Sequence, residues 1–273
     1  MSRRIDRACG ARHDAAMIAF VREVARSIAE CELTYLERAP LDAARAVAQH
    51  QRYTDELREL GCRIEWLPPL PQQPDGVFVE DTAVLVPELA VITRPGAPSR
   101  RAEVESVATA LAPHLPVARI VAPATLEGGD VLRIGRTLYV GTSGRTNAAG
   151  VAQLAAALAP AGYAVRAVPM HGCLHLKSAC TVTAPGRLLV NPAWVDAGVF
   201  DVASVITVDD AEPFGANTLT VGTVTLVSAD YPRTRARLEA AGITTRALEV
   251  SEVHKAEAAL TCMSLLLGEG AAD

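Results

Sequence analysis

The sequence lacks any apolar run long enough to cross a membrane. A membrane-spanning helix needs about 18 to 20 consecutive apolar residues. The best candidate, Leu260–Leu267, is far shorter and contains Thr261, Cys262 and Ser264. The first residues, MSRRIDRACGARHD, are basic and have no apolar core, so we do not expect a signal peptide. The sequence therefore predicts a soluble, cytoplasmic protein without a membrane partner.

Paired cysteine motifs and basic stripes are also missing. The six cysteines contain no C-x-x-C pair, and without a secretory signal we expect reduced thiols. The net charge is −5 and the arginines are scattered, which gives no reason to expect a nucleic-acid partner. We expect no metal and no cofactor.

The chain has enough apolar residues for one large core. Half of the residues are hydrophobic and 21% are charged, which argues against global disorder. No linker rich in glycine, serine and proline interrupts residues 17–268, so we predict a single α/β domain there. We expect residues 1–16 to be a disordered extension and residues 269–273 to be a tail.

Helix start and stop signals recur along the chain. Asp42, Ser99 and Asn147 each precede a helical pattern and are residue types that cap helix N-termini. Gly61 fits the end of the first helix, and Pro232 fits the first turn of the last one.

Short β-branched runs in hairpin pairs lie between these helices. Such runs are typical of buried strands. They cover residues 62–68, 82–93, 131–141, 180–191 and 218–229. Two strands followed by a helix therefore form a repeating unit.

Acidic residues interrupt two of these runs. FVEDTAVLV, residues 78–86, reads as a buried strand that carries Glu80 and Asp81, and TLEGGDVL places Glu127 and Asp130 before another run. Burying a carboxylate costs several kcal/mol unless a cation or a hydrogen-bond donor meets it. Neighbouring strand residues point to opposite faces, so we favour Asp81 over Glu80 as the group that meets a cationic ligand.

Polar residues mark a regular period. Glu80, Glu127, His175, Asn217 and Cys262 are separated by 47, 48, 42 and 45 residues. Units of this length that stack in a ring would direct equivalent positions at one axis. We therefore expect these residues to converge on a central pocket.

Six motifs together resemble the dimethylarginine dimethylaminohydrolase family of the guanidino-group-modifying, or pentein, superfamily. They are PDGVFVEDTAVL, ITRPGAPSRR, TLEGGDVL, GRTN, LHLKS and LTCMS, in the order and with the spacing of that family. The resemblance covers about residues 17–267. It implies a five-bladed pseudo-symmetric α/β propeller, in agreement with the repeat count.

The resemblance also implies an activity and three catalytic residues. The reaction is hydrolysis of Nω-methylated L-arginine, both asymmetric dimethylarginine and monomethylarginine, to L-citrulline and dimethylamine or methylamine. Cys262 would be the nucleophile that forms a covalent thiouronium, His175 the general acid and base, and Glu127 the group that orients His175. Animal members are expected to have aspartate at the position of Glu127.

Further residues follow from the resemblance as substrate contacts. Asp81, with Glu80 nearby, would hold the guanidinium. Arg100 and Arg145 would bind the carboxylate, and Asp75 the α-amino group. Residues 26–35 would form a lid in which Ile28 offers its backbone carbonyl to the substrate. The protein would act on a small molecule as a monomer or homodimer.

Cysteine and histidine suit this chemistry. A guanidinium carbon is a poor electrophile, and a thiolate is a strong nucleophile that splits one hard step into two easier ones. Histidine can protonate the leaving amine, and a carboxylate on its other nitrogen fixes the tautomer. A thiol among acids should have a raised pKa until a cation binds, so we predict substrate-assisted ionisation of Cys262.

Several alternatives stay open. Cys262, within ALTCMSLLL, could be a buried core cysteine, because free cysteine often packs as a small hydrophobic residue. His171, Cys173 and His175 in HGCLH could bind a metal, although Gly172 disfavours the helix that would align them. A different activity, arginine deiminase activity on unmethylated arginine, is a further alternative. The chain could also be a non-catalytic relative that binds arginine.

Overall fold

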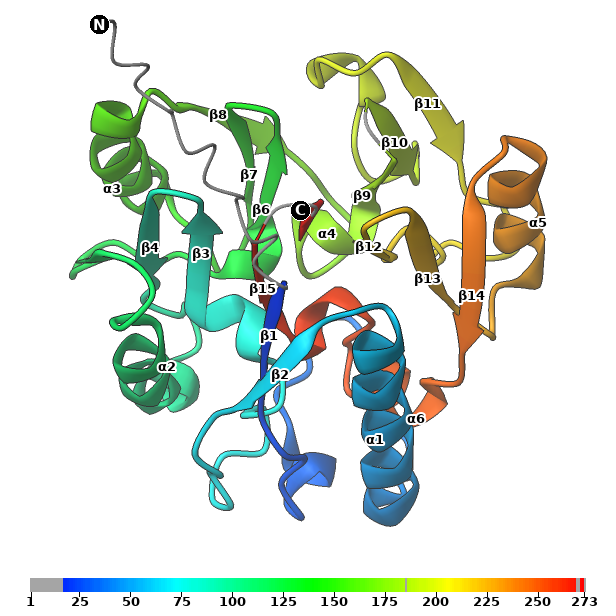
Figure 1. Ribbon diagram of the computed structural model, residues 1–273, viewed down its shortest axis with the longest axis horizontal. Coiled ribbons are helices and arrows are strands. Elements are labelled where there is room, and N and C mark those ends of the chain that lie inside the picture. Colours follow the sequence, from blue (N-terminus) through cyan, green and yellow to red (C-terminus); the bar gives the residue numbers. More distant parts are fainter. Residues whose placement is uncertain (1–16, 185, 269–270, 273) are drawn as a thin grey trace, which may run out of the picture.

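The computed structural model describes residues 17–184, 186–268 and 271–272. The predicted extension, residues 1–16, and most of the predicted tail lie outside this part of the chain. Five small sheets stand around a central axis (Figure 1). The predicted five-bladed α/β propeller is confirmed.

Each sheet has the same three parts. An inner and a middle strand pair antiparallel, and an outer strand pairs in parallel with the middle one. The inner strands are β3 (Ala83–Val86), β6 (Val131–Ile134), β9 (Cys180–Ala184), β12 (Leu219–Val221) and β15 (Leu265–Leu267). The middle strands are β1 (Ile18–Val21), β4 (Leu89–Ile92), β7 (Thr137–Thr142), β10 (Arg187–Val190) and β13 (Val224–Ser228). The outer strands are β2 (Arg63–Trp66), β5 (Val117–Arg119), β8 (Ala164–Pro169), β11 (Ser204–Thr207) and β14 (Thr244–Leu248). A short strand, β16 (Ala271–Ala272), adds to β12.

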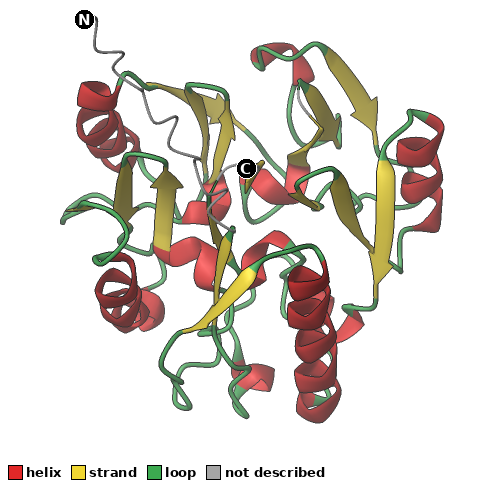
Figure 2. Ribbon diagram, viewed as in Figure 1, coloured by secondary structure: helices red, strands yellow, loops and turns green. Residues whose placement is uncertain are grey.

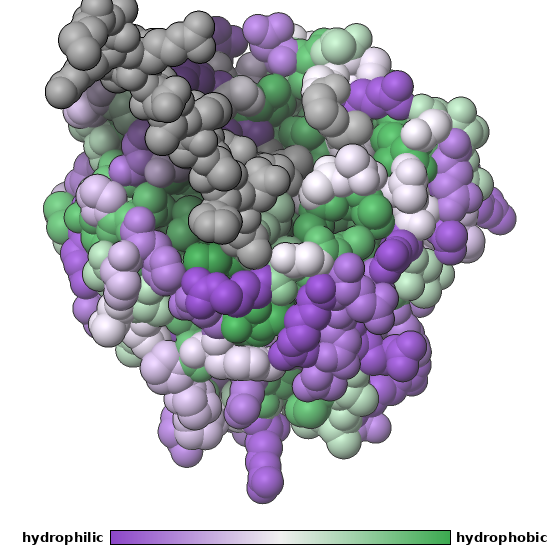
Figure 3. Space-filling view, viewed as in Figure 1, coloured by the Kyte–Doolittle hydropathy of each residue, from purple (hydrophilic) through white to green (hydrophobic). Residues whose placement is uncertain are grey.

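Helices lead from the middle to the outer strand and cover the outside of the ring (Figures 1 and 2). They are α1 (Ala43–Glu59), α2 (Val104–Leu111), α3 (Ala148–Leu158) and α5 (Pro232–Ala240), and a 3₁₀ turn, Ala197–Val199, replaces the helix in the fourth blade. On α1 the buried Ala46, Tyr53 and Leu57 share one face, as helical periodicity requires. Hydrophilic side chains gather on the surface over this helix (Figure 3). No helix among the described residues is long and apolar enough to cross a membrane.

Most of the predicted helix boundaries are confirmed. The Asp42 side chain accepts hydrogen bonds from the first turn of α1, and Asn147 does so for α3. Gly61 follows the end of α1 with a φ of 90°, and α5 begins at Pro232. The predicted cap at Ser99 is wrong, because Ser99 lies within the 3₁₀ turn Pro98–Glu103 and its hydroxyl donates to Glu32.

Short helical turns precede four of the five inner strands. They are the 3₁₀ turns Val79–Thr82, Gly128–Asp130 and Thr261–Met263, and the short helix α4 (Leu176–Ala179). The prediction of a strand through Glu80 and Asp81 is therefore wrong, since β3 begins only at Ala83. The β-branched residues favour a strand, but the tight turn lets both acids reach partners in other blades.

Strand β15 closes the ring. β15 pairs antiparallel with β1, so that Leu265 lies opposite Phe20 and Leu267 opposite Ile18. The first blade thus contains strands from both ends of the described chain. The short turns that contain or follow four of the predicted markers lie near the centre of the ring (Figure 1). Hydrogen bonds join Asn217 and Glu80 to Thr261, which precedes Cys262, and Glu127 to His175, so the markers converge as the spacing indicated.

Candidate active site

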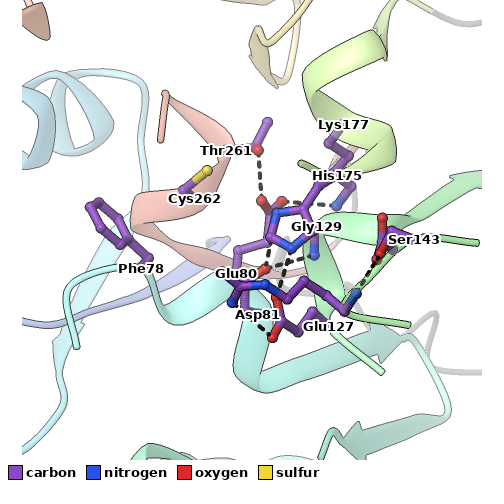
Figure 4. Close-up of polar contacts among 12 residues, drawn as sticks. Phe78, Glu80, Asp81, Glu127, Gly129, Ser143, His175, Lys177, Thr261 and Cys262 are labelled. Carbon is purple, nitrogen blue, oxygen red and sulfur yellow. Dashed lines mark hydrogen bonds and ion pairs between the residues drawn. The ribbon is translucent and has the colours of Figure 1, made fainter. Parts of the chain in front are cut away.

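A small cavity opens where the turns of several blades meet. It has a volume of about 20 Å³, and we call it the site cavity. It is lined by Glu32, Asp75, Phe78, Asp81, Arg100, Arg145, Leu174, His175, Ala256, Glu257, Ala258 and Cys262. Cys262, Phe78 and His175 come from three different segments (Figure 4). Besides Cys262, five residues that were predicted to be catalytic or to bind substrate therefore line this cavity. They are Asp75, Asp81, Arg100, Arg145 and His175.

A second cavity lies on another side of the cysteine. It has a volume of about 90 Å³ and is lined mostly by apolar side chains, among them Leu36 and Phe214. The two cavities share Leu174, Glu257, Ala258 and Cys262. Cys262 therefore borders open space on two sides, which is unusual for a core cysteine.

His175 and Glu127 form a buried pair. The imidazole Nε2 lies 2.7 Å from Glu127 Oε2, and the other ring nitrogen, Nδ1, lies 3.8 Å from Asp81 Oδ1. Burial lowers the pKa of His175, but Asp81 and Glu127 outweigh it and raise the pKa above the usual value. Burial raises the pKa of Glu127, yet His175 and nearby arginines reverse the effect and lower it. The pair is thus an imidazolium beside a carboxylate, and His175 can donate a proton.

Asp81 is held rigidly at the cavity wall. Its Oδ2 accepts a hydrogen bond of 2.5 Å from Arg100, and its Oδ1 accepts one of 3.0 Å from the backbone N–H of Gly129 (Figure 4). A Cβ atom at Gly129 would lie 2.7 Å from the His175 ring and 2.8 Å from Asp81, so only glycine fits there. The glycine brings the carboxylate and the imidazole close together.

Cys262 lies on the turn Thr261–Met263, which leads into β15. Its Sγ accepts a hydrogen bond of 3.4 Å from the backbone N–H of Ala259. Burial, followed by the negative charges of Glu80 and Asp81, raises the pKa of the thiol well above its usual value. In the empty site the sulfur is therefore a neutral thiol.

Glu80 is directed away from the site cavity. Its Oε1 accepts from Lys177 Nζ at 2.9 Å and its Oε2 accepts from the Thr261 hydroxyl at 2.7 Å. Glu80, Lys177 and Thr261 line a separate cavity. The prediction that Glu80 lies near the guanidinium is thus corrected: Glu80 supports the turn that carries Cys262.

Arg100 lines the site cavity and also holds Asp81. Its guanidinium is buried and donates to Asp81, to Glu103 and to the carbonyls of Phe78 and Asp75. These acceptors engage each of its three nitrogens. The role of Arg100 as a contact of the substrate carboxylate stays a prediction.

Replacing Arg100 by alanine should lower the free energy of unfolding by about 3 to 5 kcal/mol, because the Asp81 and Glu103 carboxylates would stay buried without their cation. Urea unfolding measures the effect. The neighbouring Arg101, which is only half-buried and bonds the Pro95 carbonyl, is the matched control. Arg101→Ala should cost less than about 1 kcal/mol. Equal losses in the two variants would contradict the role of Arg100.

Two other predicted contacts lie in the walls. Arg145 donates to the Thr34 hydroxyl at 3.0 Å, and its Nη1 lies 3.6 Å from Glu127 Oε1. Asp75 accepts from the backbone N–H of Glu32 at 3.2 and 3.3 Å. Arg145 and Asp75 thus face the cavity with side chains of opposite charge.

Ile28 is not brought to the site. Its side chain is fully buried in the core, and its carbonyl accepts from the N–H of Cys31 within the 3₁₀ turn Ile28–Glu30. Residues farther along the predicted lid, Glu32 and Leu36, line the two cavities instead. The prediction for Ile28 is corrected because the turn uses its carbonyl locally.

The alternative metal site in HGCLH does not form. Cys173 is buried with its thiol directed at the His175 carbonyl, 3.4 Å away, while His171 is exposed. Within the described ranges, the group with metal-ligand spacing is Asp81, Glu127 and His175, whose ligand atoms lie within 4.8 Å of one another. The buried Arg100 already balances Asp81, so this group is explained as an ionic network.

Sequence reasoning missed several functional residues. Lys177 and Thr261 hold Glu80, and Glu257 accepts hydrogen bonds from the N–H groups of Thr34 and Tyr35. Lys177 lies in LHLKS, where a lysine two positions after His175 was the available signal. Glu257 carries no such signal.

Known proteins of similar sequence include several dimethylarginine dimethylaminohydrolases. The sequence model of the family "N,N dimethylarginine dimethylhydrolase, eukaryotic" matches residues 34–181. The dimethylarginine dimethylaminohydrolase of Streptomyces coelicolor is 39% identical over 92% of this chain and 97% of its own length. That of Pseudomonas aeruginosa is 35% identical over 89% of this chain and 96% of its own length.

Solved structures agree with these sequence matches. A mutant dimethylarginine dimethylaminohydrolase from Pseudomonas aeruginosa complexed with citrulline superposes with a TM-score of 0.86 at 33% identity, and covers 92% of this chain and 99% of that one. The N-terminal domain of ArgZ, an arginine dihydrolase from cyanobacteria, has a TM-score of 0.84 at 20% identity, over 93% of this chain and 98% of that one. The latter likeness concerns the fold alone.

Proposed function

This chain belongs to the dimethylarginine dimethylaminohydrolase family, and we propose that it hydrolyses Nω-methylated L-arginine to L-citrulline and an alkylamine. One observation carries the proposal: Cys262, the His175–Glu127 pair and Asp81 come from separate blades and meet at one cavity. All these residues belong to one chain, so the proposal holds for a monomer or a homodimer.

Charge complementarity orients the substrate. Asp81 would accept paired N–H bonds from the planar guanidinium, because Arg100 and Gly129 occupy its other sides. Arg145 would bind the substrate carboxylate, and Asp75 the ammonium group. The substrate is then held at both ends, with its guanidinium carbon beside the sulfur.

In the first half-reaction the Cys262 thiolate bonds to the guanidinium carbon. The bond from that carbon to the methylated nitrogen then breaks, and the His175 imidazolium gives its proton to the departing amine. Glu127 keeps the imidazole oriented and stabilises its charged form. A covalent S-alkylthiouronium remains on the sulfur.

In the second half-reaction the neutral His175 takes a proton from water. The resulting hydroxide adds to the thiouronium carbon, the carbon–sulfur bond breaks, and the sulfur leaves as the thiolate, while the added hydroxyl gives its proton to the solvent as the carbonyl forms. The product carries a urea group, which is citrulline. Neither half-reaction requires a metal or an organic cofactor.

Citrulline and amine release from a panel of arginines tests the proposal. Asymmetric dimethylarginine and monomethylarginine should both yield citrulline, with dimethylamine and methylamine released in equal amounts. The same rates should be found in excess chelator. Turnover of unmethylated arginine with release of ammonia, and no turnover of the methylated forms, would favour the deiminase alternative. Saturable heat in calorimetry without citrulline would favour a binding protein.

The Michaelis constant should rise as the pH falls through about 6. Burial raises the pKa of Asp75 to about 6, although Arg100 opposes the effect. Above this pH the carboxylate attracts the substrate ammonium, and below it the neutral acid does not. For a single carboxylate with this pKa, the ionised fraction falls about tenfold between pH 7 and pH 5. We therefore expect KM at pH 5 to be about tenfold above its value at pH 7.

Asp75→Asn separates this effect from other titrations. Burial also raises the pKa of Asp130 to about 6, but Asp130 does not line the site cavity. The variant should have a high KM that does not change between pH 5 and 7. A wild-type KM that is flat over this range would contradict the assignment of Asp75.

A further inference from the structure

One peptide group links His254 to the nucleophile. The carbonyl of Ala258 accepts from His254 Nδ1 at 3.1 Å, and the N–H of Ala259 donates to Cys262 Sγ at 3.4 Å. The carbonyl and the N–H belong to the same planar peptide unit. By orienting this peptide group, His254 therefore also fixes the direction in which the Ala259 N–H points at the sulfur.

The surroundings of His254 fix which of its nitrogens carries the proton. Nε2 lies 2.9 Å from the Ser228 hydroxyl, and that oxygen accepts at 3.2 Å from the N–H of Asp230. The hydroxyl hydrogen is then free to be donated to Nε2, so the proton of the ring sits on Nδ1 and points at Ala258. Burial lowers the pKa of His254 and so favours a neutral ring, although Asp230, 3.7 Å from Nε2, opposes the effect.

The loop that holds the peptide is strained. Glu257 has a φ of 56°, the one positive value among the described residues other than glycine. Its carboxylate accepts from the N–H groups of Thr34 and Tyr35 at 2.6 and 2.8 Å. A left-handed conformation at such a residue persists only where contacts impose it. Residues 256–259 are therefore clamped, with His254 on one side and the segment around Thr34 on the other.

We propose that His254 is a positioning residue for the reaction: it holds the Ala258–Ala259 peptide so that the Ala259 N–H stabilises the Cys262 thiolate. The inference rests on the proposed function. Hydrogen bonds to a charged acceptor are about twice as strong as neutral ones, so this N–H favours the thiolate over the thiol. The Ala259 N–H counteracts the rise in the thiol pKa that Glu80 and Asp81 cause. It also stabilises the sulfur when the thiolate forms again in the second half-reaction.

Three substitutions test the role of the Nδ1 proton. His254→Ala removes the donor. His254→Asn places an amide N–H near the position of Nδ1, and His254→Gln places it near that of Nε2. Each variant is compared with its own Cys262→Ser counterpart, so that the difference in absorbance near 240 nm reports the Cys262 thiolate as a function of pH. His114→Asn, at the surface beside Glu65, is the control.

We expect His254→Ala and His254→Gln to lower kcat about tenfold, with KM within about twofold, and to move the midpoint of Cys262 ionisation upward. His254→Asn should recover most of both values. Equal behaviour of the Asn and Gln variants, or an unchanged midpoint in a folded His254→Ala, would overturn the inference. If His254→Ala does not fold, the Asn and Gln pair decides. If the wild type forms no citrulline, the proposed function is refuted. The midpoints of Cys262 ionisation in the variants still test the role of His254 in that case.

Discussion

Cys262→Ser should form no measurable citrulline, with kcat lowered by a factor on the order of 10⁴ or more, because a hydroxyl with a pKa far above that of a thiol cannot attack a guanidinium. Dimethylarginine should still bind, since Asp81, Asp75 and Arg145 are unchanged. Product release and calorimetric affinity measure the two effects separately.

Cys62→Ser is the matched control. Cys62 is buried beside the end of α1 and lines neither cavity at Cys262. The kcat of Cys62→Ser should stay within a few-fold of the wild-type value. Activity retained in Cys262→Ser would remove the nucleophile from the mechanism and return Cys262 to a role in packing.

Binding of a cation should ionise Cys262. Glu80 and Asp81 raise the pKa of the thiol in the empty site, after the effect of burial. A guanidinium or amidinium about 5 Å away contributes about 3 kcal/mol at an effective dielectric constant of 20, which corresponds to about a 100-fold larger thiolate fraction. A cationic amidine that does not react should therefore move the midpoint of Cys262 ionisation down by about two pH units and accelerate alkylation of Cys262 at pH 7.

The free enzyme supplies the contrasting measurement. Without the amidine, alkylation at pH 7 should be slow and thiolate absorbance absent. A neutral urea analogue of the same shape should leave both unchanged, which separates charge from closure of the site. Rapid alkylation of the empty enzyme, with thiolate already present, would show that some other group ionises the sulfur.

The ring could be predicted because its signal repeats. Five polar markers at similar spacing indicated five units and a common axis, and the inner and middle strands of four blades followed from the β-branched runs. Four outer strands, β5, β8, β11 and β14, were missed. Their residues are mostly exposed or partly exposed, so their sequences lack the apolar pattern of a buried strand.

The division of labour between the two neighbouring acids could not be predicted. Glu80 pairs with Lys177, which lies 97 residues away in the sequence, and Asp81 pairs with Arg100. Nothing local distinguishes the two carboxylates: Lys177 belongs to another blade, whereas Arg100 lies between β4 and β5 of the same blade. The use of the Ile28 carbonyl by its own turn and the contact of His254 with the Ala258 carbonyl likewise have no signal in the sequence.

The closure of the first blade by β15 has a consequence for biosynthesis. Cys262 emerges from the ribosome after the other three turns, and it lies shortly before the strand that completes the ring. Domains generally fold as units. A nascent chain that still lacks β15 has an incomplete first blade, so the sulfur and the closed ring are gained in the same step.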